Sequence, residues 1–157
     1  MQFVKIAWLA GVIDGEGSFT IFNRKNKSKN GNFIVTPTAN ITITNSNKAL
    51  IDECEQILKN IGVKYSLKNP RNSTTRTLER LDIRNYKSIM ILINILLPYL
   101  VGKKDQAILM KEFVKKALFR IHFSNSTERR EFLVRMSKLN KLGQVIRRDY
   151  TPGPHPK

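Results

Sequence analysis

The sequence lacks the cysteine pairs that form disulfides in secreted proteins and the long apolar runs that span membranes. It has one cysteine, Cys54, so no disulfide can form within the chain. A lone cysteine on an apolar helix face is ordinarily a small buried hydrophobic residue. No run of about 18 apolar residues occurs, which argues against a membrane span, and the N-terminus lacks the features of a secretory signal. These absences predict an intracellular protein without a membrane partner and leave its compartment open.

Several familiar kinds of site are missing as well. The two histidines, His122 and His155, are far apart in the chain, so no Cys/His metal cluster is apparent. An EF-hand loop that began at Asp14 would need Glu at its twelfth position, where Lys25 stands. The sequence "GEGSF" precedes a predicted strand instead of opening a helix, and no Gly-Lys-Ser/Thr follows it, which excludes a P-loop.

Acidic residues are scarce: 12 Asp and Glu stand against 28 Lys and Arg, for a formal net charge of +16. This balance favours a polyanionic partner, either nucleic acid or an anionic membrane surface. The excess is concentrated, because segments 18–45 and 63–84 hold ten basic and two acidic residues, whereas segment 46–62 carries a net −1. No basic amphipathic helix with a bulky apolar face stands out, so nucleic acid is the favoured partner.

The hydrophobic patterns predict helices that alternate with strand hairpins. In chain order they predict a helix, two strands, a helix, two strands and three helices, over residues 3–13, 18–26, 33–44, 45–62, 63–68, 75–84, 86–97, 104–121 and 127–142. Two hairpins separated by a helix predict one four-stranded antiparallel sheet with helices on one face. The length fits a single domain over residues 1–150, and we expect residues 151–157 to be a disordered tail.

The first helix is apolar nearly all round. Such a helix is buried on more than one side, and the chain contains no second copy of this segment to cover it. Ala7, Ala10 and Gly11 are small enough to let another backbone come close. We therefore expect a partner helix from a second molecule.

An acidic turn is predicted directly after this helix. Asp14 and Glu16 alternate with Gly15 and Gly17. Magnesium is commonly held by one or two carboxylates, with water and substrate phosphate completing its shell, and glycine lets phosphate approach the backbone. On spacing alone, an ordinary helix end with turn residues is the alternative.

The nonapeptide "LAGVIDGEG", Leu9 to Gly17, resembles the LAGLIDADG motif that names a family of homing endonucleases. The predicted element order is similar to that family up to about residue 121, and "PYLVGKKDQA" (98–107) resembles its segment with a basic active-site residue. The resemblance implies an α+β fold, with an αββαββα core whose sheet forms a DNA-binding saddle, plus C-terminal helices. With one motif, the chain resembles the homodimeric members, which bind pseudo-palindromic double-stranded DNA.

The resemblance also implies roles for particular residues. Glu16 would bind the catalytic divalent ion, Mg²⁺ or Mn²⁺, with Ca²⁺ as a non-catalytic substitute. The backbone carbonyl of Gly15 would be a second ligand, and Asp14, mainly structural in the family, is a less favoured one. Lys103 aligns with the basic active-site residue, with Lys104 as the second choice.

Further residues follow from the same resemblance. Asn45, or Ser46 beside it, and Gln106 would be polar members of the catalytic site. The dimer interface would contain Ala7, Trp8, Ala10, Gly11 and Asp14. The candidate DNA contacts are Thr20, Phe22, Arg24, Asn26, Ser28, Lys29, Thr36, Thr38, Asn40, Thr42, Lys64, Ser66, Lys68, Arg71, Arg76, Thr77, Glu79 and Arg80. In the fourth strand, Arg76 and Arg80 point to one face and Thr77 and Glu79 to the other, so the DNA-facing set is open.

The function implied is a staggered double-strand cut in a long DNA target by metal-assisted phosphodiester hydrolysis, by an intron-encoded enzyme. One alternative is a maturase that binds intron RNA, and another is a catalytically inactive DNA-binding protein of the same fold. Glu16 distinguishes the endonuclease from the two alternatives, because DNA cleavage requires this carboxylate.

Overall fold

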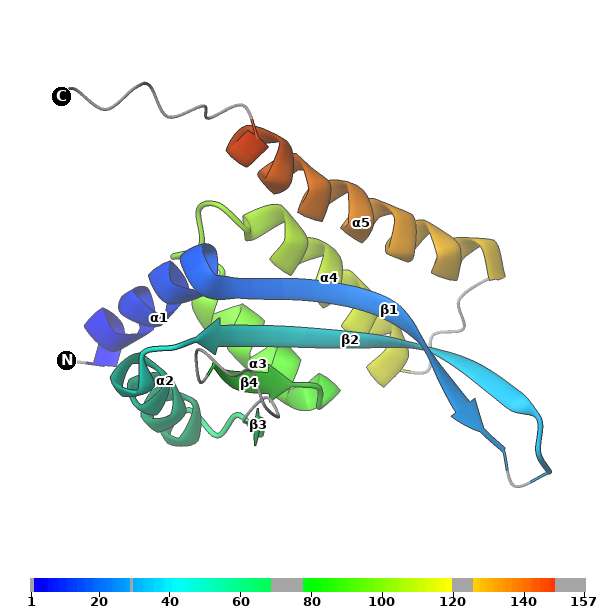
Figure 1. Cartoon of the computed structure of the whole chain (residues 1–157), viewed down its shortest axis with the longest axis horizontal. Helices are drawn as coiled ribbons and strands as arrows, with labels where there is room; N and C mark the ends of the chain where they lie inside the picture. Colours follow the sequence, from blue (N-terminus) through cyan, green and yellow to red (C-terminus); the bar gives the residue numbers. More distant parts are fainter. Residues whose placement is uncertain (1, 29, 69–77, 120–125, 149–157) are drawn as a thin grey trace, which may run out of the picture.

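The structure is a computed structural model that describes residues 2–28, 30–68, 78–119 and 126–148. Figure 1 shows the elements in chain order. They are α1 (Gln2–Glu16), β1 (Gly17–Lys27), β2 (Phe33–Asn45), α2 (Lys48–Asn60), β3 (Ser66–Lys68), β4 (Glu79–Ile83), α3 (Tyr86–Leu96), α4 (Lys104–Leu118) and α5 (Ser126–Arg148). The predicted α+β class and αββαββα order, with helices added at the C-terminal end, are confirmed.

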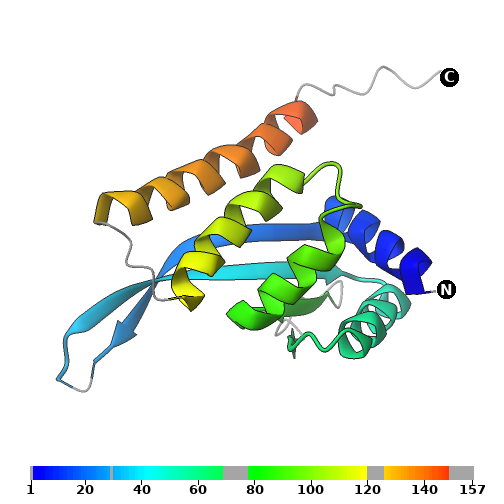
Figure 2. The ribbon, with the colours of Figure 1, turned by 180° about the vertical axis from the view of Figure 1, so that it is seen from behind.

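The four strands form one antiparallel sheet in the order β1-β2-β4-β3. Helices α3 and α4 lie across one face of it, as Figure 2 shows from behind. Strand side chains alternate between faces, and the buried set points toward these helices: Phe19 is opposite Ile41, which is opposite Ile83. The other face, which we call the free face, carries the intervening residues of each strand.

The β1–β2 hairpin extends well beyond the rest of the sheet (Figure 1). Alternating burial along β1 stops after Ile21, and from Phe22 onward the side chains are exposed on both faces. The distal half of the hairpin is therefore an arm that leaves the core. Gly31, with φ of 82°, occupies the left-handed conformation that the tight turn at its tip requires.

Helix α1 is longer than the sequence predicted. The expected end at residue 13, followed by a turn over 14–17, was wrong: the helix runs to Glu16 and β1 begins at Gly17 with no loop between them. At Gly17 a Cβ atom would lie 2.6 Å from the carbonyl oxygen of Ile13 and 2.9 Å from its Cα. The chain passes directly from helix to strand because this position has no side chain.

Replacement of Gly17 should therefore destabilise the protein. We expect Gly17→Ala to lower the free energy of unfolding by about 3 kcal/mol, because backbone atoms must move to admit the methyl group. The control is Gly102→Ala, where a Cβ would make only ordinary contacts, with side-chain atoms of Asp14 at 3.8 Å. That change should be neutral or stabilising by up to about 1 kcal/mol, because alanine restricts the unfolded chain more than glycine does. Urea unfolding measures both, and equal stabilities would contradict this explanation.

Other boundaries differ by a few residues. Helix α5 continues to Arg148, beyond the predicted end at 142, and β3 is only three residues long. The start of the predicted strand 75–84 and the tail 151–157 lie outside the described residues. No helix in the described ranges is long and apolar enough to cross a bilayer.

Helix α5 covers the outer edge of β1. The Nδ2 atom of Asn140 donates to the carbonyl oxygen of Phe19 at 3.0 Å. An open strand edge invites pairing with other chains, and a covering helix suppresses it. The sequence-predicted C-terminal helices thus protect the sheet as well as extend the core.

Candidate active site and nucleic-acid interface

The carboxylate of Asp14 is fully engaged by the loop that leads into α4. Its Oδ2 accepts hydrogen bonds from the backbone N–H groups of Val101 at 2.7 Å and Gly102 at 3.1 Å, and its Oδ1 accepts one from Lys103 at 2.9 Å. The N-cap of α4, Lys103, makes no side-chain capping bond of its own. Asp14 therefore stabilises the entry to α4 from a distant part of the chain, where a negative charge also suits the helix dipole.

Removing this carboxylate should loosen the loop. We expect Asp14→Ala to cost about 2 kcal/mol in unfolding free energy, because hydrogen bonds to a charged group are lost together. Asp52→Ala is the control: Asp52 is an exposed carboxylate with a Lys48 partner at 2.6 Å, and its loss should cost under about 0.5 kcal/mol. Urea unfolding compares the two variants, and similar costs would refute the assignment of Asp14 to the loop.

The side chain of Lys103 lies at the C-terminal end of α1. Its Nζ donates to the carbonyl oxygen of Ile13 at 3.0 Å and also to that of Asp14. The last carbonyls of a helix attract cations, because they carry the negative end of the helix dipole. Packing thus places this ammonium beside the segment that ends in Glu16, although 87 residues separate the two in sequence.

The carboxylate of Glu16 differs from that of Asp14 in exposure and hydrogen bonding. It is exposed, and among the described residues its carboxylate has no hydrogen-bond or ion-pair partner. The described part of the chain contains no cluster of three or more His, Cys, Asp or Glu side chains that could hold a metal. The Glu16 carboxylate and the exposed backbone of Gly15 are suitable ligands for a hard cation such as Mg²⁺. They form only part of a coordination shell, which phosphate and water would complete.

The other two predicted catalytic residues are engaged elsewhere. Strand register places Asn45 near the junction of α1 and β1, opposite Glu79, but its Oδ1 accepts from the backbone N–H of Asn47 at 2.8 Å. Gln106 is buried, and its Nε2 donates to the carbonyl oxygen of Leu139 in α5 at 3.4 Å. The structure therefore brings Lys103 and Asp14 together at the end of the helix that carries Glu16, while Asn45 and Gln106 each make a hydrogen bond to another part of the chain.

The free face of the sheet carries most of the predicted DNA contacts. Register pairs Thr20 with Asn40 and Lys68 with Arg80, so these side chains share a face. The predicted contacts on this face are Thr20, Phe22, Arg24, Asn26, Thr36, Thr38, Asn40, Thr42, Ser66, Lys68 and Arg80. Ser28 and Lys64 lie in flanking loops.

Register assigns the residues of the fourth strand to the two faces of the sheet. Arg80 lies on the free face, whereas Glu79, opposite Asn45, is on the helix-facing side. Lys29, Arg71, Arg76 and Thr77 lie outside the described residues.

Sequence reasoning missed one residue at the centre of the free face. Asp82 is fully buried there, although it lies on the side of the sheet without helices. Burial opposes its ionisation, but hydrogen bonds from Asn40, Arg80 and Thr42 outweigh that effect and keep the pKa of Asp82 below its ordinary value. The alternation Arg80, Asp82, Arg84 along one strand was the available signal, because residues two apart share a face.

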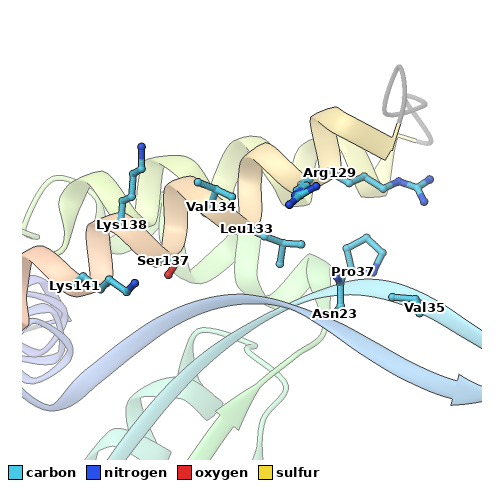
Figure 3. Close-up of a pocket in the computed structure, with 10 residues that line it drawn as sticks. Asn23, Val35, Pro37, Arg129, Leu133, Val134, Ser137, Lys138 and Lys141 are labelled. Carbon is cyan, nitrogen blue, oxygen red and sulfur yellow. The ribbon is translucent and has the colours of Figure 1, made fainter.

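A groove lies on the opposite side of the sheet, between the arm and α5 (Figure 3). Asn23, Val35 and Pro37 approach it from the arm, and Lys138 and Lys141 are among the basic side chains that α5 contributes. These strand residues belong to the helix-facing set, so the groove is separate from the free face and from Glu16.

Known structures share this fold. An archaeal intron-encoded homing endonuclease complexed with DNA is 16% identical, with a TM-score of 0.70, and the alignment covers 100% of this chain and 91% of that one. The homing endonuclease I-CvuI, in complex with its target in the presence of 2 mM Ca, is 20% identical with a TM-score of 0.62, over 99% and 87% of the two chains. I-SmaMI bound to cleaved DNA is 21% identical with a TM-score of 0.61, over 98% of this chain and 50% of that one.

Sequence comparison gives two further matches. A 68-residue stretch, 43% of the chain, is 35% identical to an uncharacterised protein of Methanocaldococcus jannaschii and spans 22% of that protein. A family model described as LAGLIDADG endonuclease matches residues 9–114, which include the nonapeptide, the whole sheet and Lys103. With the motif, the fold and this match in agreement, the chain belongs to the LAGLIDADG endonuclease family.

Proposed function

We propose that this chain is an intron-encoded homing endonuclease that cuts both strands of a long, pseudo-palindromic DNA target as a homodimer. The proposal rests on the different environments of two neighbouring carboxylates, those of Asp14 and Glu16. Asp14 accepts hydrogen bonds from three backbone N–H groups, whereas Glu16 is exposed, at the end of the helix whose carbonyl oxygens bind Lys103. A carboxylate left available in a chain of net charge +16 suits a site where a cation and phosphate meet.

The free face supports binding of duplex DNA. It is lined by hydroxyl, amide and basic side chains, which can bind phosphates and read base edges. A two-stranded ribbon fits the major groove, and the β1–β2 arm is such a ribbon (Figure 1). The archaeal intron-encoded endonuclease and I-SmaMI are both solved with DNA bound, which agrees with this use of the fold.

Helix α1 offers a surface for a second copy. Val4, Trp8, Gly11 and Gly15 recur at helical spacing and are all exposed, with Val4 at 72% and Trp8 at 39%. A Cβ added at Gly11 or Gly15 would meet nothing within 4 Å, so both glycines are flat outward positions where a partner helix can approach closely.

Two of the residues predicted for the dimer interface, Ala10 and Asp14, are engaged within their own chain. Ala10 has no exposed surface and packs in the core of its own chain, so we leave it out of the interface. Asp14 is half-buried and bound to its own loop, whereas Ala7 and Trp8 remain available. The chain also spans only half of I-SmaMI, and two copies of it would match that length.

The catalytic roles follow from these positions. Glu16 and the carbonyl of Gly15 would hold a divalent cation, with a second Glu16 from the partner copy nearby. Such an ion, when bound, supplies a Lewis acid and makes water a better nucleophile. Lys103, fixed on the last carbonyls of α1, keeps positive charge next to the place where negative charge builds up on the phosphate.

The proposal is tested by offering purified protein a duplex that contains the uninterrupted host-gene junction, with Mg²⁺ or Mn²⁺. We expect both strands to be cut, and no cutting in EDTA. Mass measurement on and off DNA should show two chains per duplex. Wild-type protein that binds the junction tightly and never cuts it with either metal would favour the inactive DNA-binding alternative.

A further inference from the structure

Asp82 lies among cations on the free face. Its Oδ1 accepts a hydrogen bond from Nε of Arg80 at 2.9 Å, and its Oδ2 accepts one from Nη2 of Arg84 at 3.0 Å. The Nζ atom of Lys68, on the adjacent strand, is 3.8 Å from Oδ2. One buried carboxylate thus holds the side chains of two arginines and balances part of the charge of a third cation.

The two arginines remain reachable from solvent. Their side chains are 43% and 41% exposed, while the carboxylate that holds them is fully buried. A guanidinium group has five N–H donors, and Asp82 uses one on each arginine, so most donors stay available. Arg80 is further oriented by a 3.5 Å contact from Nη2 to Oγ1 of Thr42. Anchoring one edge of a planar fork pre-organises its other edge.

The same network extends to buried polar side chains of β2. Asn40 is only 2% exposed, and its Nδ2 donates to both Thr42 and Asp82 at 2.9 Å. The Oδ1 atom of Asn40 is buried and has no hydrogen-bond partner among the residues that the structure describes. A buried, unpaired acceptor is costly, and the two hydrogen bonds that Nδ2 of the same amide donates to Thr42 and Asp82 offset part of that cost.

We propose that Asp82 is a positioning residue that sets DNA specificity, by directing Arg80 and Arg84 toward base edges and withholding them from phosphates. This inference rests on the proposed function, because it assumes that the free face meets DNA. An arginine fork can bind guanine O6 and N7 together, and that contact is the commonest specific one. Non-specific affinity depends instead on how many phosphates are neutralised, and a cation already paired with a carboxylate contributes less to that number.

The test is to separate specific from non-specific affinity in Asp82→Asn. A binding site is first selected from a random duplex library with wild-type protein. Dissociation constants are then measured from 50 to 300 mM KCl, on the selected duplex and on a scrambled one. We expect the variant to bind the scrambled duplex more tightly, with a salt slope steeper by about one per subunit. Its preference for the selected duplex should fall at least about fivefold.

Asp52→Asn is the matched control, because it removes the same charge from an exposed helix position on α2 and should change neither quantity. Arg80→Lys provides a second variant that keeps the charge but lacks the planar fork. We expect it to lose preference at least about fivefold, with little change of salt slope.

The outcomes separate the two proposals. Wild-type protein that prefers no duplex overturns the proposed function itself. Where the wild type does discriminate, a folded Asp82→Asn variant with unchanged preference and salt slope overturns the role of Asp82. If circular dichroism shows that this variant does not fold, Arg80→Lys decides, and undiminished preference in it overturns the role.

Discussion

Glu16→Gln should abolish DNA cleavage while leaving the protein folded and able to bind DNA. We expect the rate of strand cleavage to fall on the order of 10³-fold or more, which corresponds to about 4 kcal/mol of transition-state stabilisation. The amide keeps the size of the side chain but removes the charge that would hold a divalent cation. Because Glu16 is exposed and has no partner in the described structure, its replacement should not alter unfolding free energy appreciably.

The measurement is single-turnover cleavage of the target duplex in Mg²⁺, alongside a gel-shift assay in Ca²⁺. Glu112→Gln is the matched control, because it removes an exposed glutamate of α4 whose Arg135 partner is 4.0 Å away. The control should cleave at the wild-type rate. Cleavage by Glu16→Gln within about tenfold of wild type would remove Glu16 from the catalytic site.

Gly11→Lys should convert the dimer into a folded monomer. Gly11 lies in the middle of the exposed stripe of α1, and in the described structure a Cβ added there would meet no neighbouring element within 4 Å. In a close helix–helix contact, the long charged side chain would have to be desolvated next to its own copy. We expect the dimer dissociation constant to rise at least about 100-fold, about 2.7 kcal/mol, with loss of double-strand cutting.

Analytical ultracentrifugation at several protein concentrations measures this shift. The control, Ala49→Lys, places the same side chain at an exposed position on α2 and should leave the dimer intact. Thermal unfolding should show that the Gly11→Lys monomer is folded, since lysine has a higher helix propensity than glycine. A Gly11→Lys protein that remains dimeric would place the interface elsewhere.

The two acidic residues of the motif show how far sequence reasoning reached. Their spacing and the family resemblance favoured Glu16 over Asp14 as the metal ligand. Neither pattern predicted that Asp14 would bond three N–H groups at residues 101–103, because that contact joins segments almost ninety residues apart. Local patterns describe neighbours along the chain, whereas the availability of a carboxylate depends on what packs against it.

In the strands too, sequence patterns predicted the elements, and tertiary structure decided which residues share a face. Alternating residues predicted two hairpins and a polar face, and the structure has both. The register between β2 and β4 then decided that Arg80 and Asp82 lie on the free face and Glu79 on the other, since a shift of one residue reverses the faces of a strand. Asp82 was overlooked because the alternation Arg80, Asp82, Arg84 places three charged side chains on one face but does not show that the middle one is buried.

By itself, the amino-acid sequence determined the family, the order of helices and strands, the basic character of the sheet and the apolar first helix. These properties follow from the motif, the hydrophobic periodicity and the composition, which can be analysed without knowing which distant residues are in contact. Only the tertiary structure decided that Gly17 must lack a side chain, that Ala10 is buried in its own core, and that Asp82 holds two arginines. Each of these depends on which atoms meet after the chain has folded, and close packing makes that outcome sensitive to a single methyl group or charge.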